Sequence, residues 1–147
     1  MIIRNAKIED AEELLRWRND RITRENSKNN TLVDKNSHIK WINNILKDKS
    51  RVLYIGEENK VRIGVVRFDC NMEKLMAETS INLNPAMRGK NLSVSLLNLT
   101  IKKFLKKHTF TLNASIKKNN NKSISLFKKC GFILKGSCKY YDYYHYY

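Results

Sequence analysis

The sequence predicts a mixed α/β domain, in which a mostly antiparallel central sheet carries helices on both faces. Two observations predict this fold class. In the first half of the chain, three strand-like segments follow one another through polar links, which is typical of antiparallel hairpins. In the second half, helices alternate with strands, and a helix between two strands is typical of a crossover connection. The predicted order over residues 1–147 is β-α-α-β-β-β-α-β-α-β(-β), in a single domain.

Length and composition are those of one folded domain. A chain of 147 residues with 41% hydrophobic residues excludes intrinsic disorder, and such a chain buries about two-thirds of its unfolded surface. The formal net charge of +15 favours anionic partners. Nucleic acid, acidic membrane surfaces and phosphorylated cofactors all satisfy that condition.

Sulfur and nitrogen ligands are scattered. Three cysteines, Cys70, Cys130 and Cys138, are an odd number without metal-ligand spacing, and the three histidines show none either. We therefore expect reduced thiols and no metal site. The chain becomes charged within its first four residues, unlike a signal peptide, and no apolar run approaches the ~18 residues of a membrane span. The sequence predicts a cytoplasmic protein without a membrane partner.

The N-terminal elements are predicted from their periodicity. Residues 1–8 form a short strand, and residues 9–20 form a helix with acidic residues in its first turn. Residues 36–48 form a second helix, with Trp41 beside its apolar face. The residues at helical spacing in these two helices are Ala11, Leu14, Leu15, Arg18, Ile42, Ile45 and Leu46.

The remaining helices and strands are predicted from the same kind of periodicity. Its expected elements are strands over 51–57, 60–69, 76–84 and 109–116, helices over 93–107 and 121–130, and one or two closing strands within 131–147. The clearest helix is that over 93–107, because Val94, Leu97, Ile101 and Leu105 form one apolar stripe.

A strand, a short loop and this helix together predict an anion site. Pro85 breaks strand pairing, Gly89 allows close approach of the backbone, and Arg88 and Lys90 add positive charge. Ser93 keeps the first turn of the helix uncrowded. Since the first turn of a helix has unpaired N–H groups and the positive end of the helix dipole, the loop is suited to a pyrophosphate.

This loop resembles the pyrophosphate loop of the GNAT superfamily of acetyl-CoA-dependent N-acetyltransferases. That loop reads Arg/Gln-x-x-Gly-x-Gly/Ala, and the corresponding residues here are Arg88, Gly89, Lys90, Asn91, Leu92 and Ser93. The match departs at Asn91, where glycine is usual, and at Ser93, where glycine or alanine is usual. Asparagine tolerates the left-handed conformation better than most residues, and serine is small.

A second motif supports the resemblance, which then covers essentially the whole chain. The family's later element reads Asn-x-x-Ala-x-x-Leu-Tyr-x-x-x-Gly-Phe, and it matches Asn120, Ser123, Leu126, Phe127, Gly131 and Phe132. The resemblance implies the GNAT fold and acetyl-CoA as cofactor. It assigns cofactor binding to the loop, to Asn120, Ser123 and Phe127, and to the backbone of Ile81, Asn82 and Leu83, on a strand that is bulged in the family.

By this resemblance, an amine attacks the thioester directly in a ternary complex. Glu78 is the candidate general base, and its alternative role is that of a solvent-facing strand carboxylate. The family's usual general acid is the tyrosine of the Leu-Tyr pair, which is Phe127 here. Phenylalanine has no proton to give, so the candidates for that role are Tyr141, Tyr143 and solvent.

The acceptor is expected to lie beside the first two helices. With the strands that follow, they resemble acetyltransferases of the pseudaminic acid pathway, which act on an amine of a UDP-linked amino sugar. The resemblance assigns the acceptor site to Trp17, Arg18, Asn19, His38 and Trp41. Burial of the tryptophans in the core and a polar turn after Trp17 are the simpler explanation of the same pattern.

Three alternatives stay open. The enzyme could be a protein N-terminal acetyltransferase of the kind that modifies ribosomal proteins, or an inactive homologue, given Asn91 and Phe127. From a different class, it could be a basic module that binds nucleic acid, although we expect a solvated face and no nucleic-acid partner. The lysines concerned are Lys102, Lys103, Lys106, Lys107, Lys117, Lys118, Lys122, Lys128 and Lys129. A terminal aromatic strand could also pair with a second subunit to form a homodimer.

Overall fold

A computed structural model describes all residues, 1–147, and contains a seven-stranded sheet in the order β1-β2-β3-β4-β5-β7-β6. The strands are β1 (Ile2–Asn5), β2 (Arg51–Glu58), β3 (Val61–Asn71), β4 (Met76–Leu83), β5 (Thr111–Lys117), β6 (Ile133–Ser137) and β7 (Tyr141–Tyr146). All neighbours are antiparallel except β4 and β5, which are parallel. The fold class is therefore the predicted one, with two closing strands.

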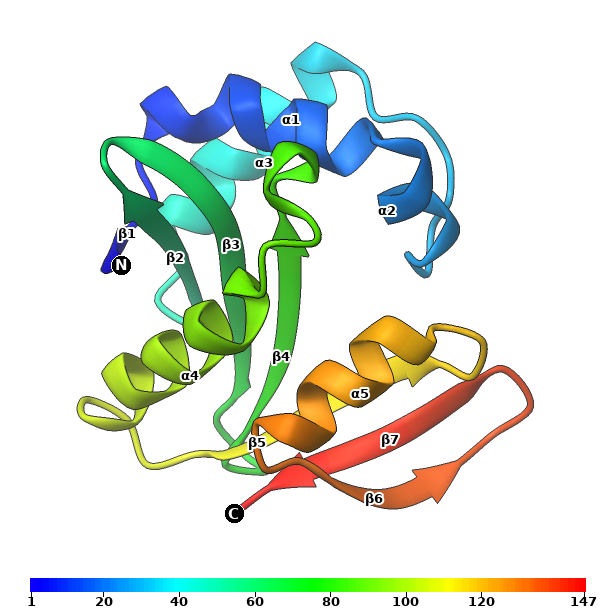
Figure 1. The fold of residues 1–147 in the computed structure, drawn as a ribbon. Coiled ribbons are helices and arrows are strands. Elements are labelled where there is room, and N and C mark those ends of the chain that lie inside the picture. Colours follow the sequence, from blue (N-terminus) through cyan, green and yellow to red (C-terminus); the bar gives the residue numbers. More distant parts are fainter.

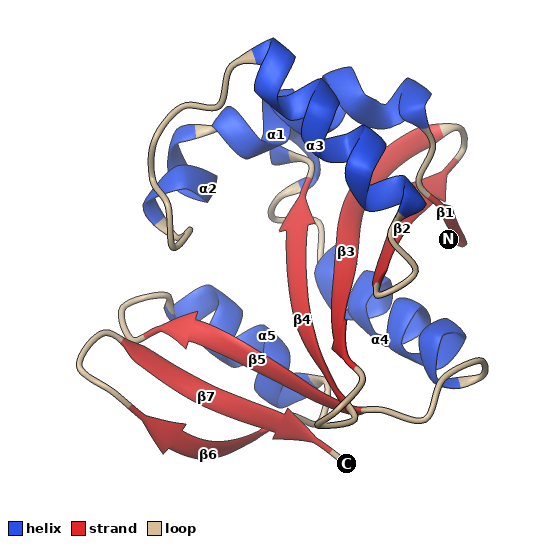
Figure 2. Ribbon diagram, turned by 180° about the vertical axis from the view of Figure 1, so that it is seen from behind, coloured by secondary structure: helices blue, strands red, loops and turns tan.

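Helices cover both faces of the sheet, as the sequence predicts (Figure 1). They are α1 (Ala11–Asn19), α2 (Arg21–Glu25), α3 (Lys35–Lys47), α4 (Leu92–Leu105) and α5 (Asn121–Lys129), with short 3-10 turns at Ile8–Asp10 and Pro85–Met87. α1 and α3 pack on one face, and α4 and α5 lie on the other (Figures 1 and 2). Helix α2 is the one α-helix that the sequence did not predict.

Each face has its own core. Sixteen buried residues form the larger core between the sheet and α4 and α5, and Phe68 stacks on Phe104 within it with ring centroids 4.2 Å apart. Eight buried residues form the smaller core beneath α1 and α3, including Trp17, Ile42 and Ile45. Ile42 and Ile45 confirm the predicted face of the second helix, whereas Leu46 is 38% exposed.

The sheet opens between β4 and β5. These strands pair only over Met76–Glu78 and Thr111–Asn113, and beyond that point they diverge (Figure 2). Residues Thr79–Leu83 of β4 therefore have β3 on one side and no strand on the other. We call this side the open edge of β4.

The bulge expected on this strand is absent. β4 pairs with β3 in continuous register from Met76 opposite Asn71 to Leu83 opposite Gly64, without a shift. The expectation of a bulge was wrong for this chain, because divergence of the parallel pair already frees the backbone of β4 on the side away from β3.

Candidate functional site

The N-terminal end of α4 is an open cradle of backbone N–H groups. Asn91 precedes the helix in a left-handed conformation, with φ 57° and ψ 27°, and no side chain caps the helix. By contrast, α2, α3 and α5 are each capped by a side chain, from Asp20, Asp34 and Asn120 respectively. The uncapped first turn leaves its N–H groups available to a ligand.

The loop before α4 adds to this cradle. Gly89 has φ +75°, and a Cβ placed there would meet no atom within 4 Å, so the loop faces open space. Neither Gly89, Lys90 nor Asn91 donates its backbone N–H to another protein group. Lys90 is exposed and forms no salt bridge. This combination of free amides, a positive side chain and a helix dipole suits a diphosphate.

Arg88 does not join the cradle. Its Nη2 donates to Asp20 Oδ2 at 2.6 Å and to Thr23 Oγ1 at 3.1 Å, so the guanidinium is held by the start of α2. The Asp20 carboxylate responds to this hydrogen bond, which holds its pKa below the ordinary value. The sequence placed Arg88 among the cofactor-binding residues, and here its side chain contacts the start of α2.

The open edge of β4 presents further donors. Asn84 N–H donates to Ile63 O at 2.9 Å, and hydrogen-bonded pairs alternate along antiparallel strands. The N–H groups of Ile81 and Leu83 therefore point toward the open edge, and that of Asn82 toward β3. On the face toward α4 and α5, Thr79 Oγ1 is buried and has no hydrogen-bond partner. An unpaired buried hydroxyl beside free amides is suited to an amide-bearing ligand arm.

Glu78 is the last residue of β4 that pairs with β5, where it lies opposite Asn113. Its side chain is on the face toward α1 and α3. Its carboxylate is 41% exposed and lies 3.3 Å from Lys28 Nζ, which comes from the loop after α2. The structure thus places Glu78 at the fork of the sheet, in reach of solvent and of a cation. Its role as general base stays a prediction.

The second motif builds α5. Asn120 Oδ1 accepts the N–H of Ser123 at 3.2 Å, which makes Asn120 the N-cap of the helix. Phe127 is 3% exposed and packs against Phe132 with centroids 4.9 Å apart. Gly131, with φ +96°, ends the helix. The ring of Phe127 belongs to the larger core and has no acidic proton.

The two tyrosines considered as proton donors lie on β7. Register through β5 places Tyr141 and Tyr143 on the same face as Glu78. Tyr143 donates its hydroxyl to Cys138 Sγ at 3.3 Å. This hydrogen bond raises the pKa of Tyr143 and lowers that of the Cys138 thiol. Lys28 Nζ lies 5.8 Å from the centre of the Tyr141 ring, so Lys28 lies between Glu78 and β7.

Three of the predicted acceptor residues have packing roles. Trp17 is 3% exposed in the smaller core. His38 is 4% exposed, its Nε2 lies 2.8 Å from Ala11 O, and burial lowers its pKa. Asn19 donates to Val33 O and accepts from Val33 N–H, both at 2.8 Å, which fixes the loop between α2 and α3. These contacts match the simpler explanation offered by the sequence.

The other two acceptor residues are only partly buried. Trp41 stacks on His38 at 5.6 Å and has the Arg67 guanidinium 5.8 Å from its ring centre. Arg18 donates to Asn29 O at 2.6 Å, whereas its Nη1 is buried without a partner. Burial, and then the nearby Arg24, lower the pKa of Arg18. Neither Arg18 nor Arg24 forms a salt bridge with a carboxylate, whereas Arg67 pairs with Asp69 at 3.0 Å.

The sequence did not identify several residues of the site. Thr23, Lys28 and Thr79 fall in no motif, and only the fold brings them to the two faces of β4. Asp20 carries a usable signal, because aspartate is one of the residues preferred at a helix N-cap. The shallow hollow of about 700 Å³ beside Trp17 and Pro85 is lined by α1, Asp20 and the turn after β4, and no residue of the open edge lines it.

Two further observations concern the whole chain. No cluster of three or more His, Cys, Asp or Glu side chains is arranged to hold a metal ion. None of the helices has the length and apolar character needed to cross a membrane.

Comparisons with known proteins concern the family and the fold. The family model described as "Acetyltransferase (GNAT) domain" matches residues 3–146. A search among curated proteins finds no match. Spermidine N-acetyltransferase from Vibrio cholerae, solved in complex with CoA and spermine, is similar in structure, with a TM-score of 0.83 and 18% identity over 98% of this chain and 92% of that chain.

Two other solved structures are similar over nearly their full length. Ribosomal-protein-alanine N-acetyltransferase from Brucella melitensis has a TM-score of 0.82 and 23% identity, over 99% of this chain and 98% of that chain. An N-acetyltransferase from Staphylococcus aureus Mu50 has a TM-score of 0.81 and 25% identity, over 98% of this chain and 96% of that chain.

Proposed function

The chain belongs to the GNAT acetyltransferase family and is an acetyl-CoA-dependent N-acetyltransferase, and from this premise we propose that its acceptor is the primary amine of an anionic small molecule. Within that class we propose a nucleotide-linked amino sugar, of the kind used in surface polysaccharide biosynthesis. The amino-sugar proposal is finer than the comparisons, whose named substrates are a polyamine and a ribosomal protein.

The loop before α4 and the open edge of β4 together offer groups that suit acetyl-CoA, the acetyl donor. The amides from Gly89 to Ser93 and the Lys90 side chain would hold the diphosphate, and the amides of Ile81 and Leu83 with Thr79 Oγ1 would hold the pantetheine arm. Asn120 and Ser123 are proposed to contact the same arm from α5. When bound, acetyl-CoA supplies the thioester whose acetyl group is transferred.

The single observation that favours an anionic acceptor is the unbalanced charge beside α2. Arg18 keeps a buried Nη1 without a hydrogen-bond partner, and the positive charge of nearby Arg24 adds to burial in lowering the pKa of Arg18. An anion there would supply the missing hydrogen bond and offset the repulsion. A polyamine would add positive charge to an already cationic surface.

The chain's own part in the reaction is to position an amine and to move protons. An amine reacts only when it is deprotonated, and Glu78 is the carboxylate on the acceptor face of β4 that can take that proton, directly or through water. Lys28 Nζ lies 3.3 Å from the Glu78 carboxylate and holds it at the fork of the sheet. Tyr143 or solvent would return a proton to the departing thiolate. Trp17, Asn19, His38 and Trp41 fix the wall that carries Arg18.

The deciding experiment measures thiol release from acetyl-CoA with a panel of amines. We expect release with nucleotide-linked amino sugars, and weaker or no release with spermidine, free amino acids and peptides that have an N-terminal alanine. Release only with peptides would replace the proposal by the protein N-terminal acetyltransferase. Absence of CoA binding in calorimetry would indicate an inactive homologue.

Glu78 is tested in the same assay. Glu78→Gln should lower kcat by about 100-fold, the usual contribution of a general base, with little change in the affinity for acetyl-CoA. Glu73→Gln, at an exposed loop carboxylate of the same chain, is the matched control. Equal kcat values for Glu78→Gln and the wild type would remove Glu78 from the mechanism.

A further inference from the structure

We propose that Arg88 is a positioning residue for the acceptor, which holds α2 against the end of β4 and thereby joins the phosphate loop to the acceptor side of the site. The inference deepens the proposed function, because it takes α2 and the loop after it as the acceptor wall. It reassigns a residue whose place in the sequence motif suggested contact with the cofactor.

Four side chains form the connection. Arg88 Nη2 contacts both Asp20 Oδ2, at 2.6 Å, and Thr23 Oγ1, at 3.1 Å. The Thr23 hydroxyl lies 3.2 Å from Asn82 Oδ1 on β4 and can donate its proton there. Asp20 also caps α2 by accepting the N–H of Thr23 at 3.1 Å. Arg88 and Asp20 are 31% and 23% exposed, so solvent screens their pair only in part.

Helix α2 depends on these contacts because it has no apolar anchor. It is five residues long, none of them is buried, and its apolar residue, Ile22, is 49% exposed. At its other end, Lys117 Nζ donates to Glu25 O at 2.8 Å. An element that is too short to be stable alone takes its position from such tertiary contacts.

The connection has a functional consequence because of what lies at its two ends. The amides next to Arg88 face the place of the donor diphosphate, and the loop that follows α2 carries Lys28 to Glu78. A substitution in the Arg88–Asp20 pair should therefore weaken binding of the acceptor more than binding of acetyl-CoA.

The test compares Asp20→Asn, Arg88→Gln and the double variant. Asparagine is a good N-cap, so Asp20→Asn removes the charge partner of Arg88 and keeps the cap. We expect the KM for the acceptor to rise about tenfold in each single variant, as for loss of one charge-assisted hydrogen bond. The KM for acetyl-CoA should change less than about twofold in Asp20→Asn. The double variant should be no worse than the worse single one.

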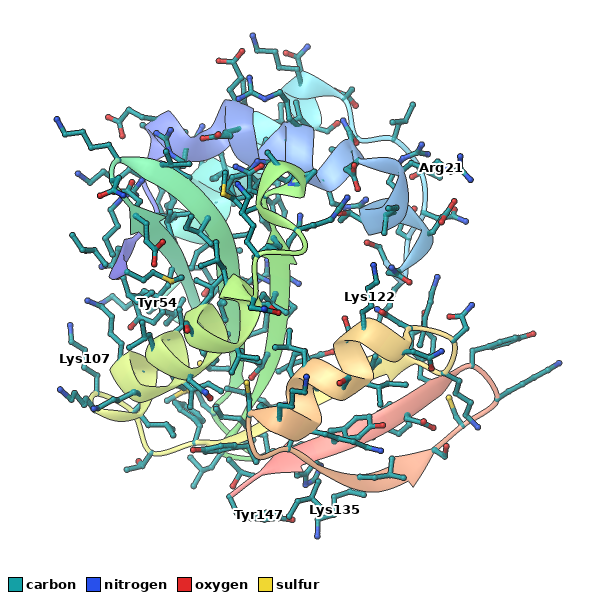
Figure 3. All side chains as sticks on the ribbon, in the orientation of Figure 1. Arg21, Tyr54, Lys107, Lys122, Lys135 and Tyr147 are labelled. Atoms are coloured by element: carbon teal, nitrogen blue, oxygen red, sulfur yellow. The ribbon has the colours of Figure 1, made fainter.

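Arg21→Gln is the matched control. Arg21 is on the same helix and pairs with Glu25 at 3.0 Å, but it is 84% exposed and points away from β4 (Figure 3). It should leave both KM values unchanged. An equal rise in the KM for acetyl-CoA in Asp20→Asn, or additive effects in the double variant, would overturn the proposal.

A second measurement needs no acceptor and separates this inference from the proposed function. In the enzyme without substrates, hydrogen exchange at the amides of residues 21–28 should be about tenfold faster in Asp20→Asn and Arg88→Gln than in Arg21→Gln. Unchanged hydrogen exchange at these amides would contradict the inference even if the enzyme acetylates amino sugars. Faster exchange with no activity on any amino sugar would sustain it while the proposed acceptor fails.

Discussion

At Asn91 the backbone has φ 57° and ψ 27°, and no side chain caps the helix that follows. Glycine enters this region without strain, asparagine with little, and β-branched residues with much. The family motif has glycine at this position, and its replacement by asparagine is the one substitution that preserves the backbone best. The departure therefore leaves the cradle intact.

This predicts a graded response at position 91. Asn91→Gly should bind acetyl-CoA as tightly as the wild type does, because glycine adopts the same conformation freely. Asn91→Val should raise the Kd for acetyl-CoA about tenfold or more, since left-handed backbone disfavours a branched side chain by about 1–2 kcal/mol. Calorimetric titration with acetyl-CoA measures both. Tight binding by the valine variant would mean that the loop does not need this conformation.

Asp10 is a second residue whose environment can be read directly. It is 1% exposed and accepts hydrogen bonds from Arg4, from Arg62 and from the N–H of Lys7. Burial alone would raise the pKa of this carboxyl, but these hydrogen bonds outweigh it and lower the pKa to about 2. Asp10 thus anchors β1, the start of α1 and β3 to one another.

The lowered pKa of Asp10 predicts acid sensitivity. The carboxylate contributes stability above its unfolded pKa of 3.8, and that contribution is lost as the pH falls through the folded value of about 2. It is on the order of 2 kcal/mol. Urea unfolding between pH 5 and pH 2 should show this loss in the wild type. In Asp10→Asn, the free energy of unfolding should be lower at pH 5 and should depend less on pH.

At the scale of elements, the long periodic segments were predictable and the short polar one was not. Helix α4 begins and ends within two residues of the prediction, because it has a continuous apolar face. Helix α2 has no such face, and its position is decided by Asp20, Arg88 and Asn82, which lie far apart in the sequence. Hydrophobic periodicity has no means of detecting an element held by tertiary polar contacts.

The candidate site divides in the same way. The free backbone amides before α4 could be predicted, because an uncapped helix start follows from local sequence. The acceptor side could not, because Trp17 and His38 are recognisable residue types whose roles depend on burial, and here both are buried. Likewise, the contacts of the Arg88 side chain are decided by the nearby Asp20 carboxylate and not by the position of Arg88 in the sequence motif.

Close packing of α4 on the sheet gives a prediction for an element. A Cβ at Gly64 would lie 2.7 Å from Leu96 Cδ2 on α4 and 2.8 Å from Asn82 O on β4. The carbonyl cannot move without shifting the strand of the open edge. Gly64→Ala should therefore lower the free energy of unfolding by about 1–3 kcal/mol, which is the usual effect of overpacking.

The control for Gly64→Ala is Gly136→Ala on β6. Its added methyl group would meet only a ring carbon of Tyr143, at an ordinary 3.8 Å, so its stability should be close to that of the wild type. Thermal unfolding compares the two variants. An equally small effect at Gly64 would mean that α4 can move away from the sheet and that its cradle is not held rigidly.

At the scale of the whole molecule, charge is the dominant feature. The chain carries a net charge of +15, and α4 has no acidic residue along its length. Lys102, Lys103, Lys106 and Lys107 surround a shallow hollow at the C-terminal end of that helix, away from the phosphate loop. Figure 3 shows Lys107 at this end and Lys122 at the start of α5. The four lysines at the C-terminal end of α4 lie too far along the helix to touch a diphosphate at its N-terminal end.

Long-range attraction and direct contact respond differently to salt, and this gives the last prediction. The Debye length is about 10 Å at 0.1 M salt and about 3 Å at 1 M, so distant lysines act on the anionic donor only at low ionic strength. The KM for acetyl-CoA should rise several-fold between those salt concentrations in the wild type. In a Lys102→Gln, Lys106→Gln and Lys107→Gln variant, the rise should be smaller and kcat unchanged. In Lys90→Gln, by contrast, the KM should be higher at both salt concentrations, because a local contact is lost. If the triple variant instead keeps the full salt dependence of the KM but loses binding to an RNA oligonucleotide that the wild type retains, the lysine surface serves nucleic acid rather than the donor.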